Sequence, residues 1–215
     1  SGGMPAVVAK IKELEATNNN VIKLHAGDAI SGSLFFTLFK GEADAALMNE
    51  ICFDAFVLGN HEFNEGDKGV AKFIDFLKSE KCSTSVLAAN IKPEVGVSAL
   101  TPNSETDYIQ PYSIIEKGGM KIGIIGIDIV RKTIMSSSPD ETTKFLDEAE
   151  TSQKIVNELK KSGVKHIILL THYGYENELE LAATIEGVDV IIGGDSHTLL
   201  GDFDKLGLNA AGPYP

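Results

Sequence analysis

Short apolar runs alternate with amphipathic stretches along most of this chain, and that alternation limits its possible folds more than any other feature. The apolar runs predict buried strands at residues 21–26, 53–58, 86–91, 166–170 and 188–192. Helical periodicity lies between them, at residues 4–17, 34–51 (with a break near Gly41), 70–77, 145–161 and 178–185. Strands that alternate with helices predict an α/β fold, with a largely parallel sheet covered by helices.

The middle of the chain departs from this alternation. Residues 112–116 and 120–128 are apolar runs on either side of Lys117-Gly118-Gly119, which predicts a hairpin and therefore a mixed or a second sheet. Residues 92–111 and 131–143 are polar and contain proline, and we expect them to be loops. No linker rich in proline, glycine or serine divides the chain, so we expect one continuous domain.

Composition excludes several classes of function. With 215 residues and 43% hydrophobic content, the chain can form a substantial core. It contains no run of 18 apolar residues, so the sequence predicts no membrane span. A net charge of −12 argues against a nucleic-acid polymer as partner, although local cations could still attract a small anion. Cys52 and Cys82 lack metal-motif spacing, and we expect Cys52, in an apolar segment, to pack as a small hydrophobic residue.

Four of the predicted strands end in acid, amide or imidazole side chains. The clusters are Gly27-Asp28, Gly59-Asn60-His61, Thr171-His172 and Gly194-Asp195-Ser196-His197. The carboxyl ends of neighbouring parallel strands meet in one crevice, and oxygen and imidazole donors without thiolate suit Zn, Mn, Fe, Co or Mg. Taken alone, Gly59-Asn60-His61 fits a helix cap with a surface histidine equally well. Asp28 is the natural carboxylate to bridge two metals, which together can activate water and hold a phosphoryl group.

In this order and spacing, the four clusters resemble those of the calcineurin-like metallophosphoesterases. Gly2-Gly3 and Gly59-Asn60-His61-Glu62-Phe63 resemble the secreted 5'-nucleotidase branch, and the Gly-Asp-Ser-His cluster followed by Leu199-Leu200-Gly201 is similar to the NAD nucleotidases of that branch. The resemblance implies a four-layer α-β-β-α sandwich with mixed, largely parallel sheets. It also implies two divalent metal ions (Zn, Mn, Co or Mg), hydrolysis of small nucleotides, and export to the periplasm or cell surface.

The resemblance assigns metal ligands among these residues. Asp28 would bridge the two metals, Asn60 and His172 would bind the second, and His197 would complete the first. The family commonly has histidine where this chain has Asp195, whose carboxylate can still bind a divalent metal.

The same resemblance assigns the catalytic pair. His61 would contact the phosphate and stabilise charge in the transition state. Asn64 stands where the family often has an aspartate that orients this imidazole. An amide there can accept a hydrogen bond but has no charge to stabilise an imidazolium. We expect Glu62 to cap the next helix or form a salt bridge, and we do not expect it to be a ligand.

The resemblance further implies that residues 1–215 are the catalytic domain of a longer enzyme. The Asp-x-His that supplies the first metal's main ligands would precede Ser1, and a substrate-binding domain would follow Pro215. We therefore expect weak or no activity from these residues alone. Alternatives within the branch are a 2',3'-cyclic-nucleotide phosphodiesterase, an NAD or UDP-sugar pyrophosphatase and a sulfur-ester hydrolase. The alternative of another class is a non-catalytic α/β binding module.

Overall fold

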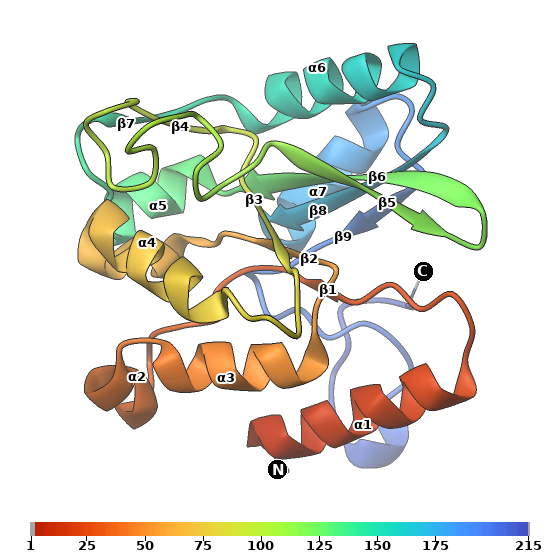
Figure 1. Ribbon diagram of the computed structural model, residues 1–215. Helices are drawn as coiled ribbons and strands as arrows, with labels where there is room; N and C mark the ends of the chain where they lie inside the picture. Colours follow the sequence, from red (N-terminus) through yellow and green to blue (C-terminus); the bar gives the residue numbers. More distant parts are fainter. Residues whose placement is uncertain (1–2, 215) are drawn as a thin grey trace.

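Two sheets lie face to face between two layers of helices in the computed structural model, which describes residues 3–214 (Figure 1). The helices are α1 Gly3–Thr17, α2 Leu34–Phe39, α3 Glu42–Ile51, α4 Gly66–Leu77, α5 Val130–Ser136, α6 Glu148–Lys161 and α7 Tyr175–Thr184, with 3-10 turns η1 Asn60–Glu65 and η2 Asp204–Leu206. The strands are β1 Leu24–His25, β2 Ala55–Val57, β3 Ser85–Leu87, β4 Ile91–Pro93, β5 Tyr112–Lys117, β6 Met120–Asp128, β7 Thr143–Phe145, β8 His166–His172 and β9 Val190–Ile192. The predicted four-layer sandwich is confirmed. Gly2, part of the glycine pair in the resemblance, lies outside the described residues.

The strands divide between the sheets in a way that positions the site. The first sheet has the order β1-β2-β3 and is parallel throughout. The second has the order β5-β6-β8-β9, in which β5 and β6 form the predicted hairpin and β6, β8 and β9 are parallel. A small antiparallel pair, β4 and β7, stands apart. Two of the polar strand ends therefore come from each sheet, and they meet where the sheets face each other.

The space between the sheets is filled by small and branched side chains. Ala55 and Val57 of β2, Leu87 of β3, Ile124 of β6 and Leu170 of β8 form this buried cluster. Because successive side chains of a strand point to opposite faces, the intervening Phe56 packs on the helical side. Strand β2 is thus buried on both faces, which explains its unbroken apolar run.

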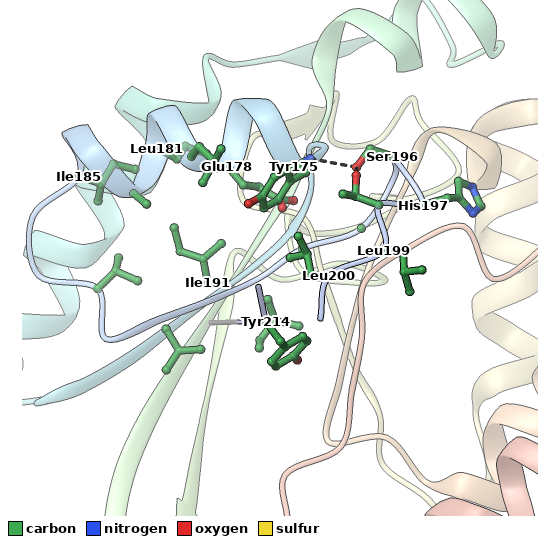
Figure 2. Close-up of a pocket in the computed structure, with 18 of the residues that line it drawn as sticks. Tyr175, Glu178, Leu181, Ile185, Ile191, Ser196, His197, Leu199, Leu200 and Tyr214 are labelled. Atoms are coloured by element: carbon green, nitrogen blue, oxygen red, sulfur yellow. Dashed lines mark hydrogen bonds between the residues drawn. The ribbon is translucent and has the colours of Figure 1, made fainter. Parts of the chain in front are cut away.

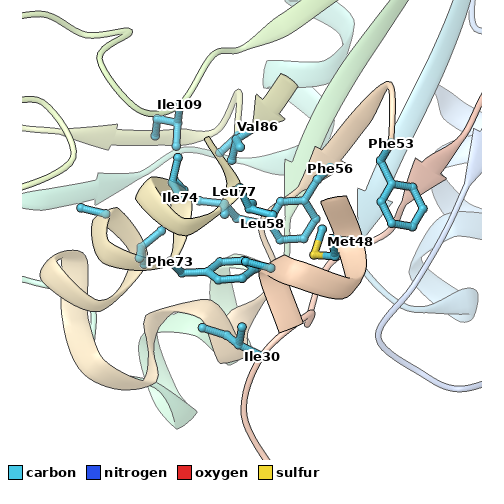
Figure 3. Close-up of a cluster of buried hydrophobic side chains, with 14 of the residues drawn as sticks. Ile30, Met48, Phe53, Phe56, Leu58, Phe73, Ile74, Leu77, Val86 and Ile109 are labelled. Atoms are coloured by element: carbon cyan, nitrogen blue, oxygen red, sulfur yellow. The ribbon is translucent and has the colours of Figure 1, made fainter. Parts of the chain in front are cut away.

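Helices cover the outer face of each sheet. Figure 3 shows Phe56 and Leu58 packed against Phe73 and Leu77 of α4, with Met48 of α3 beside them. On the opposite side, α6 and α7 cover the second sheet (Figure 1), and residues from these helices and from β6 and β8 form another core. Within residues 3–214, no helix is long and apolar enough to cross a membrane.

Two predicted boundaries are wrong because tertiary contacts decide them. The segment 131–143, expected to be a loop, contains α5 except for its first residue, and the first residue of β7. The Thr133 hydroxyl oxygen stabilises α5 through contacts with the Asp128 carboxyl group at 2.5 Å and with the Ile129 carbonyl oxygen at 2.8 Å. The strand expected at 86–91 divides into β3 and β4, because the Asn90 side chain pairs with the backbone of Asp128, donating to its carbonyl at 2.8 Å and accepting from its N–H at 3.0 Å.

The expectation that Cys52 packs as a small hydrophobic residue is also wrong. Cys52 and Cys82 form a disulfide across 30 residues, with their Cα atoms 5.2 Å apart. Cys52 caps the end of α3 and Cys82 follows α4, and the packing of these two helices brings the cysteines together. Sequence spacing carries no information about that contact.

Candidate metal centre and catalytic histidine

His172, the last residue of β8, lies at the centre of the polar strand ends. Its Nδ1 is 2.7 Å from the carbonyl oxygen of Ala26. A carbonyl only accepts, so Nδ1 donates the hydrogen and Nε2 is the nitrogen left for a ligand. Nε2 lies 3.0 Å from Oδ2 of Asp28 and 3.6 Å from Oδ1 of Asp195. It is buried and makes no regular hydrogen bond within residues 3–214.

The electrostatics around this imidazole favour a positive charge. Burial by itself lowers the pKa of His172, but the Asp28 carboxylate and the Ala26 carbonyl outweigh it and raise that pKa to about 9. Burial by itself raises the pKa of Asp28. The His172 imidazole and the backbone N–H of His61 together outweigh burial and lower the pKa of Asp28 below its ordinary value. Two carboxylates and an imidazole nitrogen are ligand types that divalent cations bind.

Asp28 is held in a tight turn between the two sheets. Its backbone is left-handed, with φ of 54°, and its Oδ1 accepts a hydrogen bond from the N–H of His61 at 2.8 Å. A Cβ added at Gly59 would lie 2.8 Å from the Asp28 nitrogen and 2.9 Å from Cδ2 of His172. Only glycine permits this approach, so the Gly-Asn-His turn begins with glycine for a steric reason.

Glu62 joins the two loops of the first sheet. Its fully buried carboxylate accepts from the N–H groups of Gly59 at 2.7 Å, Asp28 at 2.9 Å, Ala29 at 2.7 Å and Ile30 at 3.3 Å. Burial, with the nearby charge of Asp28, raises the pKa of Glu62 to about 7. Glu62 therefore caps its own turn, η1, at Gly59 and not the next helix as expected, and its bonds to the turn at 28–30 could not be predicted from the sequence.

Asp195 lies near His172 and also forms a salt bridge with a lysine. Its backbone is left-handed, with φ of 75°, and its side chain is 7% exposed. Both carboxylate oxygens lie 2.6 Å from Nζ of Lys132 in α5. Sequence reasoning missed Lys132, which lies 63 residues away in a segment expected to be a loop.

Asn60 and His197 complete the set of expected ligands. Asn60 is buried at the start of η1, and its carbonyl accepts from the hydroxyl of Ser137 at 2.6 Å. His197 is exposed and left-handed, with φ of 52°, and Figure 2 shows its imidazole at the edge of a pocket, turned away from Tyr175 and Tyr214. Across residues 3–214, no three His, Cys, Asp or Glu side chains are grouped closely enough to hold a metal ion as they stand.

His61 lies beside this cluster, exposed on η1. Its Nδ1 is 3.0 Å from the side-chain amide of Asn64, one turn further along. That amide also contacts the hydroxyls of Ser31, at 2.8 Å, and Ser137, at 3.1 Å. The structure therefore brings the two expected catalytic residues into direct contact. Ser31 and Ser137 were not foreseen.

A pocket next to the cluster has a different character. It has a volume of about 720 Å³ between α7 and β9 and is lined mainly by apolar side chains, among them Leu181, Ile191 and Leu200 (Figure 2). It reaches the strand-end cluster at Ser196, whose hydroxyl accepts from the N–H of Tyr175 at 3.0 Å, and at His197. The pocket therefore offers mainly apolar contacts beside the polar centre.

Residues 1–199 match the family model of the calcineurin-like phosphoesterases. The chain belongs to this family. It is 44% identical over its whole length to a probable 5'-nucleotidase of Treponema pallidum, and 46% identical over 95% of its length to the NAD 5'-nucleotidase of Haemophilus influenzae. It covers 35% and 32% of those two proteins, about a third of their length.

Solved structures agree with this assignment. The Haemophilus influenzae NAD nucleotidase superposes with a TM-score of 0.90 at 44% identity, over 99% of this chain and 40% of the other. The 5'-nucleotidase precursor of Thermus thermophilus gives 0.86 at 38% identity, over 97% of this chain and 39% of the other. Phosphoesterases of this family use divalent metal ions, in agreement with the donor set around His172.

Proposed function

We propose that this protein is a metal-dependent phosphoesterase that hydrolyses small 5'-nucleotides to nucleoside and phosphate. The observation that carries the proposal is the position of His172 Nε2, directed at the carboxylates of Asp28 and Asp195 where the strand ends of two sheets meet. The relatives that share 44% and 46% of its residues are named as 5'-nucleotidases, which supports the nucleotide as substrate.

The chain offers ligands for two divalent ions, drawn from Zn, Mn, Co or Mg. Asp28 would bridge them, with Asn60, His172, Asp195 and His197 as the remaining ligands of this chain. Bound there, such ions would supply a water of lowered pKa and Lewis-acid stabilisation of the phosphoryl oxygens. The protein itself orients His172 through the Ala26 carbonyl, in the manner of a ligand fixed by its second hydrogen bond.

His61 is the group we assign to the phosphoryl oxygens. It is exposed beside the cluster, its N–H holds Asp28, and its ring contacts Asn64. A ring held on one side by an amide can present its other nitrogen to a substrate oxygen. We assign His61 to transition-state contact and Asn64 to orientation of its ring.

A second candidate substrate is NAD, cleaved at a phosphate bond by the same centre. The specific observation in its favour is the match to the Haemophilus influenzae NAD nucleotidase in both sequence and structure. Asp195 stands in the Gly-Asp-Ser-His cluster, where the wider family commonly has histidine. The two substrates share one reaction type, so they differ in product and not in mechanism.

We propose further that the protein is exported and that a separate domain selects the nucleotide base. The disulfide between Cys52 and Cys82 suits an oxidising compartment such as the periplasm or the cell surface. A solved relative from Thermus thermophilus is named as a precursor. The relatives are about three times as long as this chain, which leaves room for a substrate-binding domain.

The test is an ester panel on the protein in its full natural length. After chelation, each metal is added back singly, and the products are identified: phosphate from AMP, AMP and nicotinamide mononucleotide from NAD, a nucleoside monophosphate from a 2',3'-cyclic nucleotide, and sulfate from a thiosulfate ester. We expect AMP hydrolysis that requires added metal and that falls by at least about a hundred-fold in Asp28→Asn and His172→Ala. Metal binding without hydrolysis of any nucleotide would contradict the substrate class. No bound metal and no hydrolysis would favour a binding module.

A further inference from the structure

We propose that Ser137 locks the side-chain amide of Asn64 with its oxygen toward His61, so that Asn64 accepts a hydrogen bond from Nδ1–H of His61. Ser137 is then a positioning residue for the catalytic histidine. The proposal deepens the assignment of His61 and rests on the proposed function only where kinetics are measured. Its first test needs neither substrate nor metal.

The hydroxyl of Ser137 decides the direction of the hydrogen bonds. Its oxygen lies 2.6 Å from the backbone carbonyl oxygen of Asn60 and 3.1 Å from the side-chain amide of Asn64. A hydroxyl has a single hydrogen, and a carbonyl can only accept, so the hydrogen of Ser137 belongs to the shorter contact with Asn60. The contact with Asn64 must then use a lone pair of the hydroxyl, and only the NH₂ group of the amide can donate to it.

This placement of the NH₂ group sets the other half of the amide. The oxygen and nitrogen of an asparagine amide have nearly the same outline, and their partners determine which is which. As placed, Nδ2 of Asn64 lies 2.8 Å from Ser31 Oγ and 3.0 Å from His61 Nδ1, with Oδ1 toward Ser137. Exchanging the two atoms turns the nitrogen toward Ser137 and brings the oxygen to Ser31 and His61. The Ser31 hydroxyl can donate, so this oxygen accepts from both neighbours. In the opposite orientation, one hydrogen of Ser137 would have to serve two acceptors.

The consequence for His61 concerns which ring nitrogen carries the hydrogen. An acceptor at Nδ1 keeps the hydrogen there and leaves Nε2 as the nitrogen that exchanges a proton with a substrate oxygen. An amide donor at Nδ1 would place the hydrogen of the neutral ring on Nε2 instead. Asn64 can therefore orient the ring as an acidic partner would, provided that its amide cannot turn over.

The tertiary structure is what brings Ser137 to this position. It follows α5 and lies 73 residues from Asn64. The N–H of the next residue, Ser138, donates to the carbonyl of Phe63 at 3.0 Å and ties the segment to η1. Ser137 is half-buried against η1, whereas the side chain of Ser138 is exposed. This neighbouring pair supplies a test residue and a matched control.

The deciding experiment is ¹⁵N NMR of the 215-residue chain labelled at histidine, without metal and at a pH above the raised pKa of His172 of about 9, where imidazole rings are neutral. The five histidines are assigned by single substitutions, with His61→Gln identifying the ring in question. We expect His61 to show a protonated Nδ1 and a bare Nε2. A wild-type spectrum with the hydrogen on Nε2 would overturn the proposal, and no variant has to fold for that result.

Variants then test Ser137 itself. We expect Ser137→Ala to shift the His61 signals toward a mixture of both tautomers, whereas Asn64→Asp and Ser138→Ala keep the hydrogen on Nδ1. In the full-length protein we expect Ser137→Ala to lower kcat about five-fold with KM little changed, as for loss of one positioned hydrogen bond. A wild-type tautomer retained in folded Ser137→Ala would refute the lock. Inactivity of the wild type would contradict the proposed function and leave the spectroscopic result standing.

Discussion

The carboxylate of Glu62 accepts a hydrogen bond from the backbone N–H of Asp28 at 2.9 Å, across 34 residues of chain. Glu62 stands next to His61, and Asp28 is the proposed bridging ligand, so this contact joins the catalytic loop to the metal-binding loop. A second hydrogen bond joins the same loops, because the backbone N–H of His61 donates to the Asp28 carboxylate at 2.8 Å. The geometry of the centre depends on a residue that we do not assign as a ligand.

Removal of the Glu62 carboxylate should therefore destabilise the protein. Glu62→Ala leaves the four N–H groups of Gly59, Asp28, Ala29 and Ile30 without their buried acceptor. Each unsatisfied buried donor costs about 1 to 3 kcal/mol, and we expect a total loss of at least about 3 kcal/mol in urea unfolding. Glu65→Ala, at an exposed position of the same turn, is the control and should change stability by less than about 1 kcal/mol. Equal stability of the two variants would contradict the role of Glu62.

Lys132 should compete with a metal for Asp195. Its ammonium lies 2.6 Å from both carboxylate oxygens, so a cation that binds Asp195 meets a positive charge already in place. Because about half of the Lys132 side chain is exposed, solvent weakens this repulsion. We expect Lys132→Met to raise the affinity for Mn²⁺ about three- to five-fold in calorimetric titration.

The control for this titration is Lys121→Met. Lys121 lies at the start of β6, whereas Lys132 follows the end of that strand, so this variant should leave the affinity for Mn²⁺ unchanged. An unchanged or lower affinity in Lys132→Met would show that the lysine does not oppose the metal.

Reduction of the disulfide should destabilise the fold without touching the centre. The bond between Cys52 and Cys82 closes a loop of 30 residues, and constraining the unfolded chain over that length contributes about 3 to 4 kcal/mol. We expect the double variant Cys52→Ala/Cys82→Ala to lose about that free energy of unfolding. The wild type in reducing buffer should lose a similar free energy of unfolding. A double variant as stable as the oxidised wild type would contradict the prediction.

His25 should make the protein sensitive to acid. It packs edge-on against Phe53 and Phe56, with ring centroids 5.3 Å away in both cases, and burial lowers its pKa from 6.5 to about 4. Between these values the unfolded chain binds more protons than the folded chain, so stability falls as the pH drops from 6.5 toward 4. At pH 5 the loss from this group is about 2 kcal/mol.

The pH prediction is measured as a difference between variants, because carboxyl groups titrate in the same range. His25→Phe, which keeps the aromatic packing, should lose less free energy of unfolding between pH 7.5 and pH 5 than the wild type does. His166→Gln, at an exposed strand start, should behave as the wild type. An equal loss in all three proteins would assign the acid sensitivity to other groups.

Local sequence patterns predicted much of the fold. The alternation of apolar runs and helical stretches predicted the α/β class, the central hairpin and most helices, because strand and helix periodicity are properties of neighbouring residues. Errors arose where long-range contacts override local preference. α5 forms in a polar segment because Thr133 bonds to Asp128, and the strand expected at 86–91 divides because Asn90 bonds to the same residue.

The sequence by itself determined which chemical groups stand at the strand ends, since Gly-Asp, Gly-Asn-His, Thr-His and Gly-Asp-Ser-His can be read directly along the chain. Only the tertiary structure decided what surrounds them: Glu62 under Asp28, Lys132 on Asp195 and Ser137 on Asn64. The physical reason is the range of the contacts. These bonds join residues 34, 63 and 73 positions apart, and packing of two sheets and their helices, not local periodicity, brings the partners within hydrogen-bonding distance.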